Sequence, residues 1–135
     1  MVVDTSALIE LLFGGPEKGA IRGALQDQSS GAQVISAASL VEAHVVVRRR
    51  HALPHSARMS ALLDDLVTEY RFDIEPVTPA QARLAIEGFA RYGKGTGGGA
   101  LNFGDCFSYA LAKERNDALL FVGEDFRRTD VRAAI

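Results

Sequence analysis

The chain has 135 residues, of which 47% are hydrophobic and 24% are charged. This length and composition are typical of a single globular domain, and we expect one domain over residues 1–135. The formal net charge of −2 excludes a general attraction to nucleic acid, so a polyanionic substrate would need local basic groups or a metal ion. The single cysteine, Cys106, excludes an internal disulfide and a cysteine-rich metal site.

We expect neither a targeting segment nor a membrane segment in this sequence. Met1 leads directly into an apolar run without a basic segment, and no apolar run approaches the roughly 20 residues of a membrane span. We therefore expect a cytoplasmic protein with no membrane contact.

Short apolar runs alternate with segments of helical periodicity along the chain. We predict strands at residues 2–4, 33–36, 72–77 and 118–122. We predict helices at residues 6–13, 16–28, 39–50, 55–70, 79–92 and 104–115. This alternation predicts an α/β fold with a mainly parallel sheet that is covered on both faces.

Four acidic residues lie far apart in the sequence but at equivalent places in this pattern. Each lies where a strand ends or where the next helix begins: Asp4, Glu42, Asp105 and Asp125. Because the carboxyl ends of parallel strands share one edge of the sheet, we expect these side chains to converge in one pocket. Four clustered carboxylates repel one another unless a cation neutralises them. A divalent hard metal ion is the natural counter-charge, which favours metal-assisted hydrolysis.

Each acid, taken alone, also has a structural explanation. Asp4 is suited to cap the helix that follows it, and Ser39 with Glu42 matches a capping box. Asp105 complements the dipole of its helix, and Asp125 fits a turn. A chain that needed only caps could use Ser, Asn or Thr at some of these places, so the recurrence of carboxylates favours a shared site.

Other chemistry is weakly supported by the sequence. His44 lies in an apolar helix, and His51 and His55 are separated by Pro54, so no histidine pair has the spacing of a zinc site. Cys106 has no obvious base nearby and is interpreted as a small buried apolar group. Nucleophilic catalysis is therefore not expected.

The glycine-rich segment at residues 93–100 is predicted to be a flexible loop beside Asp105. Residues 88–94 nearly match a phosphate-binding P-loop, but Gly95 replaces the required Ser or Thr and a helix precedes the segment instead of a strand. We therefore reject a P-loop and interpret the segment as a mobile lid or rim.

Basic residues near the predicted pocket are candidate phosphate contacts. Lys94 lies in the glycine-rich loop, and Arg127 and Arg128 follow Asp125 closely. The basic cluster at residues 48–51 is interpreted as a solvated helix end that complements the helix dipole.

Four segments of the chain together resemble, in order and spacing, the motifs of PIN-domain ribonucleases. They are MVVDTSAL (1–8), ISAASLVEA (35–43), LNFGDC (101–106) and LFVGEDFRRTD (120–130). The resemblance is greatest to the VapC toxins of bacterial type II toxin-antitoxin systems, and it covers nearly the whole chain. It implies a three-layer α/β/α sandwich and an endoribonuclease that depends on Mg²⁺ or Mn²⁺.

The resemblance also assigns roles to residues. Asp4, Glu42, Asp105 and Asp125 match the catalytic acids of the family, and Asp4, Asp105 and Asp125 are the expected metal ligands. Supporting polar positions are matched by Thr5, Ser6, Asn102, Thr129 and Asp130. Where this chain has Gly97, Gly98 and Gly99, related sequences often carry bulkier or basic residues, which predicts a more mobile loop and prevents the transfer of substrate preference.

Two partners besides RNA are implied by the resemblance. A small VapB-like antitoxin is expected to wrap the toxin and block the acidic pocket, and a homodimer is expected. Exposed apolar residues on the second to fourth helices are predicted to supply both surfaces.

Three other functions remain open from the sequence. A 5′-nuclease acting on structured DNA uses a related acidic pocket, although the chain is small and has no added DNA-clamping region. A phosphoacceptor or phosphatase domain also has acids at strand ends, but residues 4–6 lack a second Asp two positions on. A degenerate module that only binds a partner would normally have lost one or more of the four acids.

Overall fold

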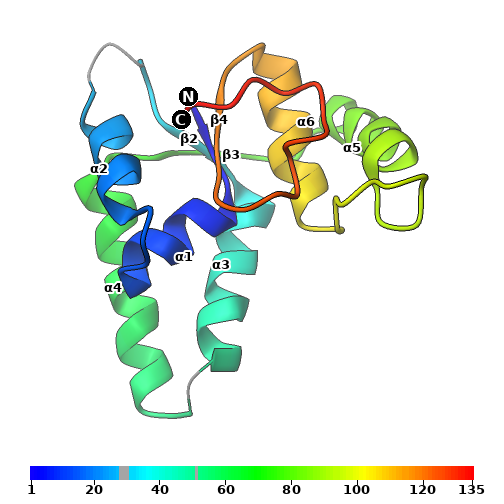
Figure 1. The fold of residues 1–135 in the computed structure, drawn as a ribbon. Coiled ribbons are helices and arrows are strands. Elements are labelled where there is room, and N and C mark those ends of the chain that lie inside the picture. Colours follow the sequence, from blue (N-terminus) through cyan, green and yellow to red (C-terminus); the bar gives the residue numbers. More distant parts are fainter. Residues whose placement is uncertain (28–30, 51) are drawn as a thin grey trace.

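The computed structural model describes residues 1–27, 31–50 and 52–135. Strands and helices alternate along the chain, as the sequence predicts (Figure 1). The strands are β1 (Val2–Val3), β2 (Val34–Ser36), β3 (Asp73–Glu75) and β4 (Leu119–Leu120). The helices are α1 (Thr5–Phe13), α2 (Lys18–Gln26), α3 (Ala37–Arg50), α4 (His55–Glu69), α5 (Pro79–Tyr92) and α6 (Asp105–Arg115).

The strands form one parallel sheet in the order β3-β2-β1-β4. β1 lies in the middle, with Val2 paired to Val34 of β2 and to Leu119 of β4. The carboxyl ends of β1, β2 and β4 are therefore neighbours along one edge of the sheet.

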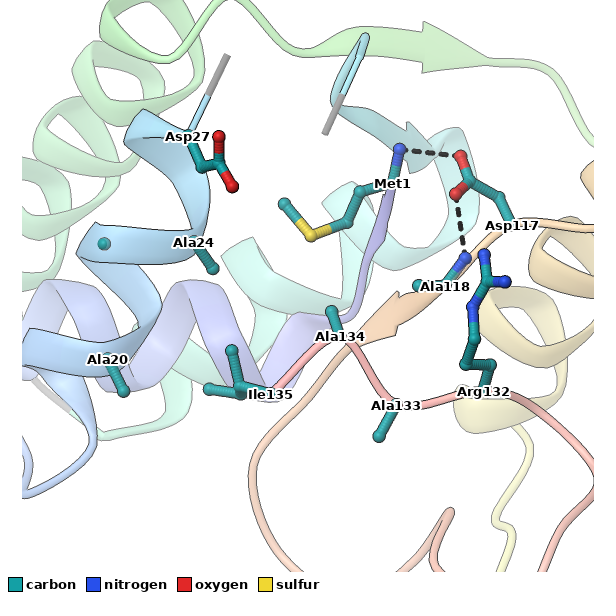
Figure 2. Close-up of a pocket in the computed structure, with 11 residues that line it drawn as sticks. Met1, Ala20, Ala24, Asp27, Asp117, Ala118, Arg132, Ala133, Ala134 and Ile135 are labelled. Carbon is teal, nitrogen blue, oxygen red and sulfur yellow. Dashed lines mark hydrogen bonds and ion pairs between the residues drawn. The ribbon is translucent and has the colours of Figure 1, made fainter. Parts of the chain in front are cut away.

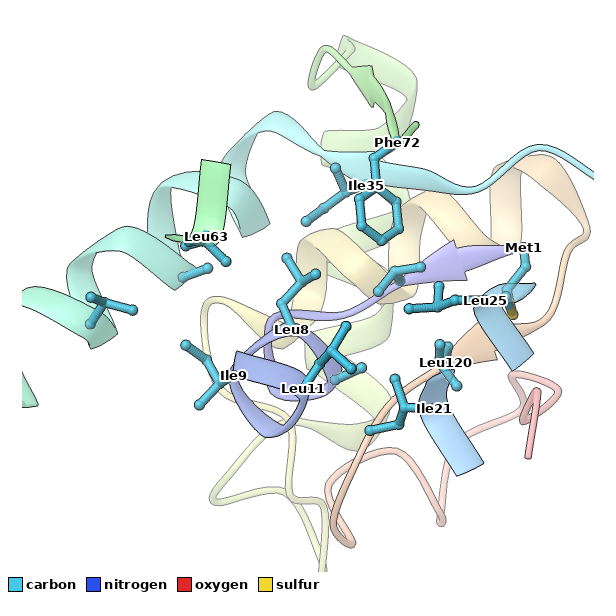
Figure 3. Close-up of a cluster of buried hydrophobic side chains, with 14 residues drawn as sticks. Met1, Leu8, Ile9, Leu11, Ile21, Leu25, Ile35, Leu63, Phe72 and Leu120 are labelled. Carbon is cyan, nitrogen blue, oxygen red and sulfur yellow. The ribbon is translucent and has the colours of Figure 1, made fainter. Parts of the chain in front are cut away.

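Helices cover both faces of the sheet. Val3 and Leu120 belong to a buried cluster with α1, α2, α3 and α4, shown in Figure 3. Val2 and Leu119 belong to a second cluster with α5 and α6 on the other face. Since successive residues of a strand point to opposite faces, β1, β2 and β4 each contribute to both cores. The predicted α/β fold with three layers and a parallel sheet is confirmed.

Several element ends differ from the predictions. α2 begins at Lys18, although Pro16 had suggested an earlier start. The backbone N–H of Glu17 instead donates to the Glu10 carboxylate at 2.8 Å, which holds the connection from α1 in a turn. The predicted end of this helix at residue 28 lies outside the described residues.

All four strands are shorter than predicted, because only a few residues of each pair with a neighbour. Among the described residues, no helix combines the length and the apolar character that crossing a membrane requires.

Candidate active site

All four predicted acids line one groove at the carboxyl edge of the sheet, with a volume of about 410 Å³. Asp4 follows β1, Glu42 lies in the second turn of α3, Asp105 begins α6 and Asp125 follows β4. The structure thus brings together residues that are separated by up to 121 positions in the sequence. Their convergence was predicted from the topology of parallel sheets.

Asp4 caps α1 and still presents an oxygen to the groove. Its Oδ2 atom accepts hydrogen bonds from the Ser6 backbone N–H at 2.8 Å and from the Ser6 hydroxyl at 2.6 Å. The Ser6 Oγ atom in turn accepts the N–H of Val122 at 3.0 Å, which ties α1 to the segment after β4. The Oδ1 atom of Asp4 is buried and has no hydrogen-bond partner. Because such an orphaned acceptor is costly, it indicates a position for a cation or a donor.

Glu42 does not form the capping box that the sequence allowed. α3 begins at Ala37, so Glu42 lies inside the helix, and its Oε2 atom accepts the Thr5 hydroxyl at 2.8 Å. The same hydroxyl lies 3.0 Å from the carbonyl oxygen of Ser39. A side chain at Gly104 would collide with the Glu42 carboxylate, so this glycine allows α3 to approach the start of α6.

Burial raises the pKa of the Glu42 carboxyl above its ordinary value. The hydrogen bond from Thr5 opposes this effect, and the negative charge of Asp4 adds to it. Glu42 therefore takes up a proton more readily than an exposed glutamate.

Asp105 is fixed by reciprocal hydrogen bonds with Asn102. Its Oδ2 atom accepts the Asn102 backbone N–H at 2.7 Å, and its own N–H donates to Asn102 Oδ1 at 3.0 Å. Burial raises the pKa of the Asp105 carboxyl to about 6; the Asn102 bond opposes this rise, and the charges of Asp4, Asp125 and Glu42 reinforce it. The electrostatic influence of all three acids on Asp105 indicates that the four act as one cluster.

The acids fit a metal ion that keeps part of its water shell. Among the described residues, no three His, Cys, Asp or Glu side chains stand close enough to form a ready-made metal cluster. Mg²⁺ characteristically binds through one or two carboxylates and retains several waters. The unpartnered Oδ1 atom of Asp4 and the neighbouring carboxylates suit this mode, and Asp105 and Asp125 complete the expected ligand set.

Two of the supporting polar residues lie away from the groove. The Thr129 hydroxyl donates to the Phe126 carbonyl oxygen at 2.7 Å and stabilises a turn. The Asp130 carboxylate accepts the Tyr109 hydroxyl at 2.9 Å and the Lys113 ammonium at 3.0 Å, which fastens the C-terminal segment to α6. By contrast, the other three supporting residues line the groove: Thr5, Ser6 and Asn102. Their predicted position beside the acids is therefore correct.

None of the three predicted phosphate contacts lines the groove. Arg127 forms an exposed ion pair with Glu124 at 2.8 Å. Arg128 donates to the carbonyl oxygen of Gly98 at 3.2 Å, and Lys94 is exposed in the same loop. That these residues contact RNA phosphate stays a prediction.

The glycine-rich loop is closed by hydrogen bonds. The N–H of Lys94 donates to the Leu101 carbonyl oxygen at 2.9 Å, and the N–H of Leu101 donates to Tyr92 at 2.9 Å. Gly95, Gly97 and Gly98 have positive φ angles, which glycine adopts more readily than other residues. This backbone conformation accounts for the glycines even if the loop does not act as a lid. The interpretation as a mobile lid finds no support in this geometry.

Sequence reasoning missed two charged residues of the groove, Glu10 and Arg50. Both were detectable from helical spacing. Glu10 lies four residues after Ser6, and Arg50 lies eight residues after Glu42, so each shares a helix face with a predicted site residue. Arg50 had been grouped with its neighbours as a solvated helix end.

Cys106 behaves as predicted. It is buried, and burial together with the Asp105 charge raises the pKa of its thiol to about 11. The thiol is therefore protonated near neutral pH and is a poor nucleophile.

A second cavity, of about 570 Å³, lies at the opposite, amino edge of the sheet (Figure 2). Its most polar contact is an ion pair of 2.6 Å between the main-chain nitrogen of Met1 and Asp117. The remaining lining is mainly small side chains of α2 and of the C-terminal segment, including Ala20, Ala24 and Ala134. Its described lining has two acids, Asp27 and Asp117, against five in the groove, so the larger cavity is not the better candidate for catalysis.

Comparison with known proteins identifies the family of this chain. The PIN-domain family matches residues 1–132. Ribonuclease VapC28 of Mycobacterium tuberculosis is 42% identical over 136 aligned positions, covering 100% of this chain and 98% of that protein. Ribonuclease VapC of Mycolicibacterium smegmatis is 40% identical and covers 98% of both chains. The chain belongs to the PIN-domain family and, within it, to the VapC ribonucleases.

Solved structures of VapC-type and toxin-antitoxin proteins share this PIN fold. The crystal structure of VapC20 from Mycobacterium tuberculosis, a toxin that cleaves the sarcin-ricin loop, has a TM-score of 0.73 and 20% identity, and covers 96% of this chain and 95% of that one. A toxin-antitoxin complex from Klebsiella pneumoniae has a TM-score of 0.64 and 20% identity, and covers 99% and 97%. At this identity the likeness establishes the fold alone.

The carboxylate cluster predicts an unusual pH dependence of stability in metal-free protein. Since the folded-state pKa of Asp105 is raised, its stabilising contribution is present below the unfolded pKa near 4 and is lost as pH rises through about 6. Urea denaturation in EDTA measures the free energy of unfolding. Between pH 4.5 and 7.5 this free energy should fall less for Asp105→Asn than for the unmodified chain, by on the order of 2 kcal/mol. Asp73→Asn, at an exposed position on β3, should keep the dependence of the unmodified chain. An Asp105→Asn variant with an unchanged pH dependence would contradict the coupling.

Proposed function

We propose that this PIN-domain protein is a metal-dependent endoribonuclease and the toxin of a type II toxin-antitoxin pair, acting in the cytoplasm. The observation that carries the proposal is the groove in which four acids from separate segments converge. Similarity to VapC ribonucleases along the entire chain supports RNA as the substrate.

We assign the metal to Asp4, Asp105 and Asp125. Ser6 orients Asp4 and Asn102 orients Asp105, so these carboxylates are fixed before substrate binds. A bound Mg²⁺, or Mn²⁺ in its place, would neutralise the acids, polarise a phosphoryl oxygen and activate water.

Glu42 is suited to accept the proton of the attacking water. Its raised pKa brings it closer to neutral pH than an ordinary glutamate, which improves a general base. In the proposed reaction the water oxygen bonds to phosphorus while its proton passes to Glu42. The bond from phosphorus to the 3′-oxygen breaks, and the 3′-oxygen leaves and takes up a proton. The products therefore carry 5′-phosphate and 3′-hydroxyl ends.

We predict that Mg²⁺ or Mn²⁺ supports cleavage of single-stranded RNA and that EDTA abolishes it. Asp4→Asn should reduce the rate at least about 100-fold, because it removes a charge that holds the ion, while Asp73→Asn should leave it unchanged. Gel analysis with end-specific enzymes identifies the product ends, and a matched DNA tests the 5′-nuclease alternative. Undiminished activity after thorough chelation, or cyclic 2′,3′-phosphate products, would exclude this mechanism.

We also propose that a VapB-like antitoxin covers the groove and that the toxin is a homodimer. An antitoxin arginine inserted among the four acids could pair bidentately with a carboxylate and displace the metal. The exposed large apolar residues are only partly where the sequence suggested, since α2 contributes none among those described. Val41 and Val45 lie on α3 and Leu62 lies on α4, whereas Ile86 and Phe89 lie on α5 and Phe103 lies before α6.

Co-expression with the small open reading frame beside the gene should give a stable complex and relieve growth inhibition. Native mass spectrometry of the purified complex is expected to find the antitoxin together with two copies of this chain. If the unmodified chain is harmless when expressed alone and captures no product of a neighbouring reading frame, the toxin role fails even where nuclease activity remains. A complex with one copy of the chain would refute the homodimer.

A further inference from the structure

The groove that holds the four acids continues away from them between α1 and α3. Its lining includes Ile9 and Phe13 on α1 and Val46 and Arg50 on α3. Glu42, Val46 and Arg50 are spaced four residues apart, so they lie on one face of the helix. At a rise of 1.5 Å per residue, Arg50 lies about 12 Å along the helix axis from Glu42.

Charge is distributed unevenly along this groove. Five acids line it: Asp4, Glu10, Glu42, Asp105 and Asp125. Arg50 is the only basic side chain among the described residues of the lining. A phosphate chain that enters the groove is repelled by the acids except where metal neutralises them. Among the described residues of the lining, Arg50 is therefore the side chain whose charge attracts the RNA.

Phe13 gives the Arg50 side chain a defined position. The Cζ atom of Arg50 lies 5.3 Å from the centroid of the Phe13 ring, within the range of a cation–π interaction. Phe13 is half-buried at the last position of α1, so the helix holds the ring in place. Arg48 and Arg49 are exposed and do not line the groove.

We propose that Arg50 binds an RNA phosphate other than the one being cleaved, and that Phe13 positions its guanidinium for this contact. The inference rests on the proposed ribonuclease function and adds a substrate-binding residue to it. The planar guanidinium presents several N–H donors that match phosphate oxygens, which a lysine ammonium does less well. Because this contact lies away from the reacting bond, it contributes to substrate binding and little to the chemical step.

A structural role for Arg50 predicts different results. An arginine in the last helical turn complements the helix dipole without any substrate, and Arg48 and Arg49 share that position. They are therefore matched controls, since they have the same charge and the same helix end but lie outside the groove. If the helix dipole were the only reason for the positive charges, substitution of each of the three arginines in turn would have a similar effect.

The test uses the full chain and a short single-stranded RNA that contains a site cut by the unmodified protein. Arg50→Ala should raise KM about tenfold, which corresponds to the loss of one charge-assisted hydrogen bond. Its kcat should stay within about twofold, and Arg49→Ala should change neither constant. Arg50→Lys should recover part of the loss, and Phe13→Leu should raise KM less than Arg50→Ala does. Equal melting temperatures of the variants and the unmodified chain exclude a folding defect as the cause of a change in KM.

A second arm locates the contact on the substrate. Single phosphates of the RNA are replaced in turn by neutral methylphosphonates, and KM is measured for each substrate. Replacement of one phosphate away from the cleavage site should raise KM about tenfold for the unmodified chain. The same replacement should have no further effect for Arg50→Ala, because the contact between Arg50 and that phosphate has already been removed.

The inference is overturned if RNA is cleaved and Arg50→Ala has the same KM as Arg49→Ala. It is also overturned if Arg50→Ala leaves the sensitivity to every methylphosphonate unchanged. If the unmodified chain cleaves no RNA in Mg²⁺ or Mn²⁺, the proposed function and this inference fail together.

Discussion

Mutual repulsion among four carboxylates at one sheet edge is the constraint on which the site depends. Asp105 shows it most directly, because burial and the charges of its three neighbours raise its pKa to about 6. The fold maintains this unfavourable arrangement by fixing three of the four acids separately. Ser6 holds Asp4, Asn102 holds Asp105, and Thr5 holds Glu42. We propose that the same repulsion gives the groove an affinity for a divalent cation, which would relieve it.

Structural and functional explanations of the acids are compatible with each other. Asp4 does cap α1, yet a helix cap requires only one carboxylate oxygen, and the other remains buried without a partner. Glu42 is different, because α3 begins before Ser39 and leaves no capping box for it to complete. The distinction between a cap and a ligand therefore concerns individual oxygens, which sequence patterns do not resolve.

The fold and the convergence of the acids could be predicted because both follow from topology. Alternating strands and helices require a parallel sheet, and parallel strands present their carboxyl ends together. Short distances in sequence did not identify the basic residue that lines the groove. Arg128 lies three residues from Asp125, but it donates to the carbonyl oxygen of Gly98. Arg50 lies eight residues after Glu42 and reaches the groove because the two residues share a helix face. Asp130 pairs with Lys113 because the C-terminal segment folds back on α6, a tertiary contact without a local signal.

The central claim, that the four acids form one cation site, is tested most directly by Mn²⁺ binding in the absence of RNA. Electron paramagnetic resonance counts free Mn²⁺ during a titration of the unmodified chain, Asp4→Asn and Asp73→Asn at neutral pH. The account predicts saturable binding by the unmodified chain and by Asp73→Asn, and its loss in Asp4→Asn. Equal binding by Asp4→Asn and the unmodified chain, or no saturable binding by the unmodified chain, would contradict it.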